Sequence, residues 1–140
     1  MRNLTVFCLI ILPVLLFSCM PHDHKDGVIC TTDYRMLMVS VKDTMSQPVH
    51  LSSYYVKKTS TGEIMDFAKE DHYTDSINSI QGIYFLFTDG KMGMTSTNGT
   101  EFEFHGMLDT SEIVNEHFII GNDECHVKIM SGNTEIIISK

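Results

Sequence analysis

The stretch that decides the fold lies at the end of the chain and reads Cys125-His126-Val127-Lys128-Ile129-Met130-Ser131-Gly132-Asn133-Thr134-Glu135-Ile136-Ile137-Ile138-Ser139. Apolar and polar residues alternate on both sides of Gly132-Asn133, a pair that favours tight turns. A two-residue turn there would gather the apolar residues of both arms on one face: Val127, Ile129, Ile136 and Ile138. The pattern therefore predicts an antiparallel hairpin, with Cys125 pointing into the core.

A second hairpin is expected between Lys91 and Gly106. Its apolar residues all have even numbers, namely Met92, Met94, Phe102 and Phe104. A two-residue turn at Asn98-Gly99 would place the two pairs on opposite faces. A three-residue loop over 97–99, with Gly99 in the left-handed region, gathers all four on one face, and we prefer that register.

Further strands follow from alternation and from short apolar runs. The run Ile83–Phe87 lies between Gly82 and Asp89-Gly90, which is typical of a central strand buried on both faces. Residues 35–42 alternate, and the two methionines on the second face suggest cover on both sides. Residues 117–120 form another short strand. Residues 49–56 also predict a strand, with these side chains in phase: Val49, Leu51, Ser53 and Tyr55.

Two regions give little strand signal. Glu63–Gln81 has a partly helical spacing at its start, but Asp71–Ser79 is polar and suggests a loop. Asp109–Asn115 suggests a single helical turn capped by Asp109. About seven short strands with turns between them predict an all-β fold, a single and approximately antiparallel Greek-key β-sandwich.

Several motifs resemble those of small bacterial lipoproteins with a carboxypeptidase-regulatory-like, or transthyretin-like, sandwich. They are the stretches 39–43, Pro48-Val49, Thr61-Gly62, 125–129 and 135–138, and the likeness spans roughly residues 30–140. The family's Gly-x-Tyr core signature has its nearest substitute in Gly82-Ile83-Tyr84. The resemblance implies a fold and a surface module, and it carries over no catalytic residue.

The N-terminus has the form of a secretory signal: Arg2, an apolar run over 6–17, and then a small residue before a cysteine. Leu16-Phe17-Ser18-Cys19 resembles the bacterial lipobox, in which the cysteine is lipidated and becomes the mature N-terminus. Phe17 is bulkier than the residue usual at its position. An uncleaved anchor or a plain secretory signal is the alternative. The apolar run is shorter than the roughly 20 residues of a membrane span.

This interpretation divides the chain into three parts. Residues 1–18 are the lipoprotein signal peptide, residues 19–29 are the lipidated cysteine and a flexible tether, and residues 30–140 are the sandwich domain. Met20 follows Cys19, so the aspartate that signals inner-membrane retention in some bacteria is absent from that position. We therefore expect a cell-envelope protein that is lipid-anchored, through palmitate, to the outer membrane, facing either the periplasm or the outside.

The four cysteines differ in their expected fates. Cys8 leaves with the signal peptide and Cys19 takes the lipid, so Cys30 and Cys125 remain as a pair in an oxidising compartment. We predict one disulfide between them. Two buried thiols or a metal pair are the alternatives, and the metal pair is disfavoured because neither cysteine belongs to a Cys-x-x-Cys motif.

The overall charge limits the partners. The chain carries 10 Lys plus Arg against 18 Asp plus Glu, for a formal net charge of −8. An acidic domain is a poor ligand for nucleic acid or for anionic lipid, since both bind basic surfaces. The partners we expect are the membrane, through the lipid at Cys19, and an envelope protein or glycan, with no nucleic acid.

Motifs for catalysis and for cofactors are missing from the sequence. It contains neither a Gly-x-Ser-x-Gly elbow, nor His-Glu-x-x-His, nor a phosphate-binding glycine loop, so we expect no enzyme activity and no cofactor. His126 is the sharpest candidate, and alternation places it on the outer face as an exposed or half-buried structural histidine. His22-Asp23-His24 is interpreted as part of a solvated spacer rather than a metal site.

Methionine is abundant, with 10 in the chain. Met36-x-Met38 and Met92-x-Met94 have the form of copper-binding methionine pairs, but methionine also fills cores as a soft, adaptable side chain. We favour core filling and predict no metal site. Two functions then remain: a lipid-anchored interaction or structural module without catalysis, or a lipoprotein that binds a metal, a glycan or a peptide.

Overall fold

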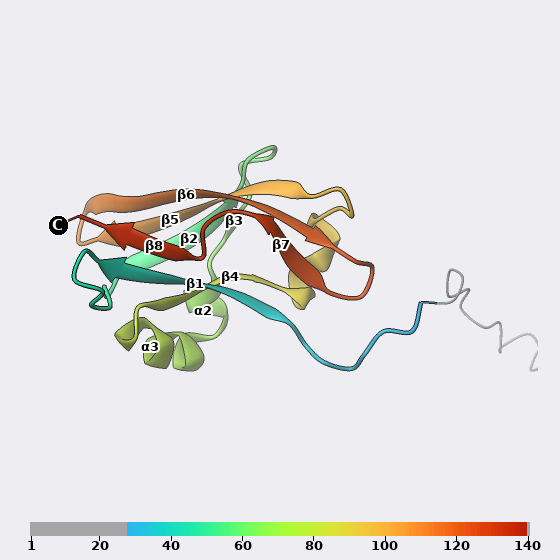
Figure 1. The fold of residues 1–140 in the computed structure, drawn as a ribbon, viewed down its shortest axis with the longest axis horizontal. Helices are drawn as coiled ribbons and strands as arrows, with labels where there is room; N and C mark the ends of the chain where they lie inside the picture. Colours follow the sequence, from blue (N-terminus) through green and yellow to red (C-terminus); the bar gives the residue numbers. More distant parts are fainter. Residues whose placement is uncertain (1–27, 140) are drawn as a thin grey trace, which may run out of the picture.

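The computed structural model describes residues 28–139, which form two β-sheets packed face to face (Figure 1). The smaller sheet has the order β4 (Ile83–Thr88), β1 (Met36–Asp43), β8 (Glu135–Ile138). The larger has the order β3 (Ile64–Met65), β2 (Ser53–Lys58), β5 (Thr100–Leu108), β6 (Ser111–Asn122), β7 (Val127–Ser131). This is the predicted all-β sandwich. The predicted signal peptide, Cys19 and the tether up to residue 27 lie outside the described residues.

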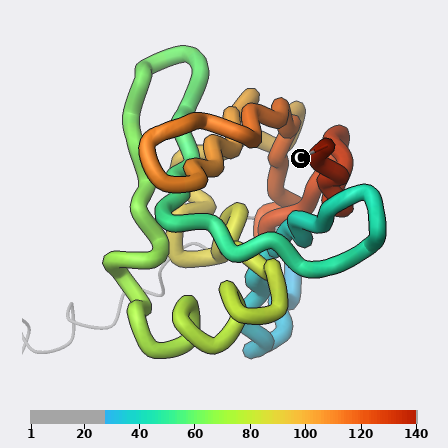
Figure 2. Tube along the Cα trace, turned by 90° about the vertical axis from the view of Figure 1, so that its left-hand side faces the viewer, coloured from blue at the N-terminus to red at the C-terminus, as the bar shows by residue number. Residues whose placement is uncertain are grey.

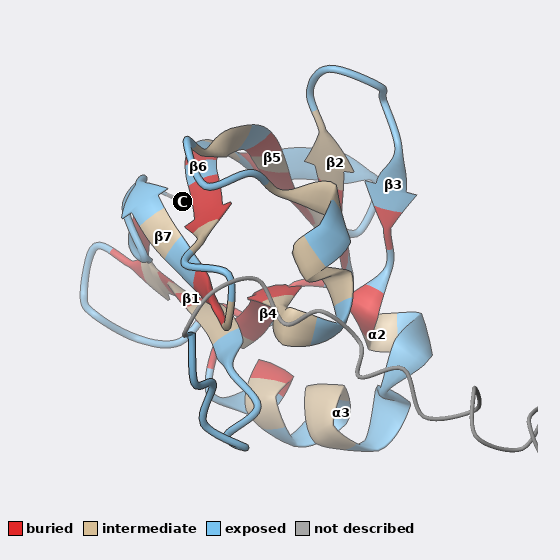
Figure 3. Cartoon of the chain, turned by 90° about the vertical axis from the view of Figure 1, so that its right-hand side faces the viewer, coloured by how far each residue is buried: buried red, intermediate tan, exposed pale blue. Residues whose placement is uncertain are grey.

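The core lies between the two sheets (Figure 3). Its largest wholly buried side chains are aromatic and come from both layers: Tyr84 and Phe87 from β4, and Phe102, Phe104 and Phe118 from β5 and β6. The ring centroids of Phe87 and Phe102 are 4.8 Å apart. Aromatic side chains bury more apolar area than any others, so these five residues supply much of the hydrophobic stabilisation.

Two short helices, α2 (Phe67–Glu70) and α3 (His72–Ile80), lie outside the smaller sheet (Figure 2). The loop predicted for Asp71–Ser79 is therefore wrong. The side chain of Asp71 caps α3 by accepting a hydrogen bond from the backbone N–H of Thr74 at 3.2 Å, and Asp66 caps α2 in the same way. The inward residues of α3 are polar, Ser79 being the buried one, whereas Tyr73 and Ile80 are exposed. The sequence therefore lacks the inward apolar stripe by which a surface helix is recognised.

Strand β4 is buried on both faces, as predicted, but it is not a central strand. It lies at the edge of its sheet, paired only with β1 among the described strands. Phe85 faces the helices and packs near Phe67, with ring centroids 6.4 Å apart, while Tyr84 faces Phe104 across the core at 6.3 Å. The helices cover the outer face, so an edge strand has the apolar composition of a central one.

The hairpin predicted at the end of the chain is wrong. β7 pairs with β6 in the larger sheet, whereas β8 crosses to the smaller sheet and runs parallel to β1, with Val41 opposite Ile136. Val127, Ile136 and Ile138 are nevertheless buried. The alternation predicts inward-facing side chains whether the two strands share a sheet or face each other across the core, so it does not distinguish the two arrangements.

The hairpin predicted for residues 91–106 is also wrong. Residues Asp89–Met94 form a 3₁₀ helix, η1, and β5 pairs with β2 and β6 instead. The helical turn expected over Asp109–Asn115 is replaced by the β5–β6 hairpin, in which Leu108 pairs with Ser111 around a two-residue turn. Asp109 adopts a φ of 55°, which aspartate tolerates better than most residues and which a tight hairpin turn requires.

The strand expected over residues 49–56 begins later and in the opposite phase. β2 starts at Ser53 and buries Tyr54 and Val56, while Val49 and Leu51 are buried in the preceding connection. The hydroxyl of Tyr84 holds this connection: it donates to the Val49 carbonyl and accepts from the Leu51 N–H, both at 2.7 Å. Buried backbone groups that no sheet ladder satisfies thereby obtain partners.

Tyr84→Phe is expected to lower the free energy of unfolding by about 2 kcal/mol, because it leaves a buried N–H and a buried carbonyl without that partner. Urea denaturation of both proteins measures the difference. Tyr55→Phe is the control, since the Tyr55 ring stacks on His105 at the surface of the larger sheet, and its loss of a hydroxyl should change little. Equal stability of Tyr84→Phe and the wild type would contradict this role.

Candidate functional site at the disulfide-linked end of the sandwich

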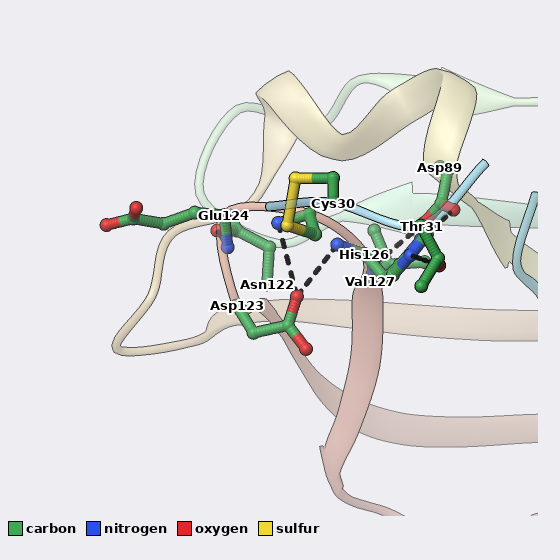
Figure 4. The surroundings of a disulfide bond; sticks show 9 residues. Cys30, Thr31, Asp89, Asn122, Asp123, Glu124, His126 and Val127 are labelled. Carbon is green, nitrogen blue, oxygen red and sulfur yellow. Dashed lines mark hydrogen bonds and ion pairs between the residues drawn. A yellow bond between two sulfur atoms is a disulfide. The ribbon is translucent and has the colours of Figure 1, made fainter. Parts of the chain in front are cut away.

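Cys30 and Cys125 form the predicted disulfide, with an S–S distance of 2.03 Å and a Cα–Cα distance of 5.3 Å (Figure 4). A turn before β7 presents Cys125. The carboxylate of Asp123 accepts hydrogen bonds from the backbone N–H groups of Cys125 at 3.2 Å and His126 at 2.8 Å. These bonds lower the pKa of Asp123. The disulfide thus joins the first described residues to a turn that the Asp123 side chain stabilises.

His126 is buried next to the disulfide, with 8% of its surface exposed. The expectation of an outer-face, exposed or half-buried histidine is wrong because β7 begins at Val127, so strand alternation does not extend back to His126. Its Nδ1 lies 2.7 Å from an oxygen of Asp89, and its Nε2 lies 2.9 Å from the hydroxyl of Thr31 (Figure 4). Neither contact has a signal in the local sequence.

Asp89 is the centre of this cluster. Its carboxylate accepts hydrogen bonds from the backbone N–H of Arg35 and that of Val127, each at 2.8 Å, as well as from His126. Burial by itself would raise the pKa of Asp89, but the hydrogen bonds from His126, Val127 and Arg35 together outweigh it and lower the pKa. The ionised carboxylate at the start of η1 therefore links the residue before β1 to the first residue of β7.

The order hydroxyl, imidazole, carboxylate is the one found in serine hydrolases. In a neutral imidazole, Nδ1–H donates to Asp89 and Nε2 accepts from the hydroxyl of Thr31. A hydrolase also needs a recess that holds the substrate and donors that stabilise an oxyanion. Thr31 is exposed and lines neither the recess beside α3 nor the recess beside β6. What the contacts do show is that the cluster holds the N-terminal arm at Thr31 and Arg35.

The methionine pairs lie on separate elements. Met36 and Met38 are on β1, and Met36 is 49% exposed, whereas Met92 and Met94 are half-buried on η1 and pack against the core. Within residues 28–139, no group of three or more His, Cys, Asp or Glu side chains is placed to hold a metal ion. The motif at 22–24 lies outside that range. None of the helices described is long and apolar enough to cross a membrane.

A recess of about 520 Å³ with both polar and apolar lining lies between β2 and the two helices. Its lining includes Tyr54, Asp66, His72 and Asp75. The Tyr54 hydroxyl donates to Asp75 at 2.5 Å. Burial, together with this hydrogen bond, raises the pKa of Tyr54. Sequence reasoning missed the recess because it predicted a loop over Asp71–Ser79, where the structure has α3.

No protein-family model, no curated protein and no solved structure matches this chain. The resemblance to the transthyretin-like lipoproteins therefore rests on the sequence motifs alone.

Asp89→Asn is expected to lower the free energy of unfolding by about 1–3 kcal/mol at pH 7, because the amide cannot satisfy all three donors and turns its own NH₂ toward one of them. The folded-state pKa of Asp89 is lowered, so the stabilisation is present above the unfolded pKa of about 3.9 and is lost as the pH falls through the folded pKa. The gap between wild type and variant should therefore shrink from pH 5 toward pH 2.

Urea denaturation at several pH values measures this gap. The control is Asp33→Asn, since Asp33 is exposed and takes part in none of the ion pairs within residues 28–139. A gap that stays constant across the acidic range would mean that the Asp89 carboxylate does not act through its charge.

Proposed function

We propose that this protein is a lipid-anchored module of the cell envelope, held at the outer membrane by Cys19, which works by contact with an envelope protein or glycan and performs no catalysis. The lipobox-like sequence at residues 16–19 supports the anchor, and the acidic composition supports partners other than nucleic acid.

The observation that carries the proposal is the Cys30–Cys125 disulfide. A disulfide between residues so far apart in sequence is typical of an exported protein, since cytosolic thiols are kept reduced. Cys30 also lies shortly after Cys19 in the sequence. Tension on a lipid tether would therefore act on the domain close to the disulfide. A covalent link there would pass force from the tether to the turn before β7 as well as to β1, so that the first strand is not pulled away alone.

The surroundings of the disulfide support the same role. Thr31 and Arg35 of the N-terminal arm are both held by the cluster around Asp89, through His126 in one case and through the backbone in the other. Groups that in a hydrolase would face a substrate are occupied here in joining the arm to β7. This favours a binding or structural module over an enzyme.

A ligand-binding lipoprotein is the second candidate, and the recess beside α3 favours it. Carboxylate, imidazole and hydroxyl groups line that recess, and such groups hydrogen-bond sugars. The recess would then hold a glycan for a neighbouring envelope system.

Cys19→Ser is expected to abolish lipidation and to release the protein from membranes. Labelled palmitate incorporation and cell fractionation measure the two effects. Cys8→Ser is the matched control, because Cys8 would leave with the signal peptide and should leave both results unchanged. Membrane partition and labelling that persist in Cys19→Ser would refute the anchor.

A further inference from the structure

One side of the larger sheet is incomplete. β6 runs from Ser111 to Asn122 and pairs with β5 from Ser111 to Ile120, but on its other side β7 pairs only with residues 119–122. The chain then leaves this sheet at β7 and crosses to the smaller one. Within residues 28–139, no strand pairs with Ser111–Phe118 on the side of β6 opposite β5. The backbone groups on this edge are therefore open to another strand.

The open edge borders a recess of about 660 Å³. Residues 113–116 of β6 form one wall, and residues 136–139, on and just after β8, form the facing wall, with Leu108 at one end. β8 is itself an edge strand, because it pairs with β1 alone among the described strands. The recess thus lies in the place that a further strand of the larger sheet would fill.

The lining combines aliphatic side chains with Asn115, Ser139 and one carboxylate, Glu116. Val114, Ile136 and Ile138 are buried, and Ile113 is half-buried. Glu116 pairs in register with the wholly buried Phe104, so both side chains point to the core-facing side of the sheet. Glu116 is half-buried there, and it belongs to none of the ion pairs found in the described part of the chain.

A half-buried carboxylate in an aliphatic recess favours a cationic partner group. Without a counter-charge it is partly desolvated, and a Lys or Arg side chain brought in by a partner would relieve that cost. The chain's own N-terminal arm is a poor candidate, since residues 28–35 lie at the opposite end of the sandwich from the C-terminus (Figure 1). Inward-pointing charges also protect the edge strands of sheets against pairing with other chains. Protection of the β6 edge is therefore the competing explanation of Glu116.

We propose that this recess binds an extended segment of a partner polypeptide, which adds a strand to the free edge of β6 and places a Lys or Arg beside Glu116. Main-chain hydrogen bonds to β6 give the affinity, and the alternate side chains that enter the aliphatic recess give the specificity. The inference deepens the proposed function, on which it rests, by naming the partner of the module as an unfolded or terminal segment of another protein.

A displayed library of random heptapeptides, panned on the purified protein, tests this inference. The selected peptides should share apolar residues at alternate positions with a Lys or Arg among them, and should bind at roughly micromolar Kd in fluorescence anisotropy. On binding, amide hydrogen exchange should slow over residues 113–118. No selected sequence above background, or protection elsewhere in the protein, would overturn the proposal.

Charge exchange tests the role of Glu116. Glu116→Lys should lower the affinity for a Lys-containing peptide at least about tenfold. The same peptide with Glu in place of Lys should regain affinity for the variant. Glu101→Lys is the matched control, because it makes the same charge change on the same sheet at an exposed side chain. An unchanged melting temperature establishes that Glu116→Lys is folded, and Glu116→Gln, which adds no charge, should weaken binding less.

Two other results contradict the inference. If Glu116→Lys leaves peptide affinity unchanged, the carboxylate does not select the partner. If the purified protein forms dimers that protect residues 113–118, the recess takes a second copy rather than a partner segment. Both measurements use purified protein, so their failure leaves membrane anchoring through Cys19 untouched, and loss of anchoring in Cys19→Ser says nothing about the recess.

Discussion

Removing the Cys30–Cys125 disulfide is expected to lower the free energy of unfolding by about 4–5 kcal/mol. The two cysteines are 95 positions apart, and closing so long a loop removes much conformational entropy from the unfolded chain. Small domains are stable by only about 5–15 kcal/mol, so the loss is a large share of the total. Urea denaturation of the wild type and of the double variant Cys30→Ser, Cys125→Ser measures it.

Reduction supplies the control for this experiment. Dithiothreitol should destabilise the wild type by nearly the same amount, because Cys30 is exposed and Cys125 half-buried, so the substituted side chains contribute little packing. The reductant should leave the double variant unchanged. If the double variant is destabilised but reduction of the wild type is not, the effect comes from the substitutions rather than from the covalent link.

The fold class was predictable because it depends on local alternation. Val39 and Val41 on β1, and Phe102 and Phe104 on β5, alternate with more exposed neighbours and are wholly buried. Such a pattern requires only that one side of a strand face the core. The disulfide was predictable for a different reason, since compartment and cysteine number left a single pair.

Strand partners were harder to predict, because the alternation does not identify the neighbouring strand. The two arms around Gly132-Asn133 match the pattern of a hairpin, yet they belong to facing sheets. The phase of β2 was misread for a related reason: Val49 and Leu51 are buried in a connection held by Tyr84, 33 residues away from Leu51 in sequence. Contacts between residues so far apart produce no periodic pattern in the sequence.

The cluster around His126 could not be predicted from the sequence either, because its members are far apart along the chain. Thr31, Asp89 and His126 come from three distant segments, and only the tertiary fold brings them together. The open edge of β6 depends on where the chain leaves the larger sheet, and that was the feature mispredicted at the final turn. The proposed binding recess thus depends on the crossing at residues 131–135.

The crossing itself gives the second large effect. Gly132 lies between β7 and β8 with a φ of 125°, a conformation that residues with a Cβ rarely adopt. A Cβ at this position would overlap the ring of Phe118, which is 1% exposed. Backbone strain and displacement of a core aromatic residue act together, so Gly132→Ala should lower the free energy of unfolding by about 3–5 kcal/mol.

Gly62→Ala separates the two causes. Gly62 also has a positive φ, of 72°, but a Cβ there would meet no atom within 4 Å. This variant bears only the backbone cost, about 1–2 kcal/mol. Equal losses in the two variants, measured by urea denaturation, would mean that the Phe118 ring moves aside freely. A larger loss at Gly132 is the expected result, because Phe118 is held between the sheets opposite Phe102 and has no solvent-exposed position to move into without opening the core.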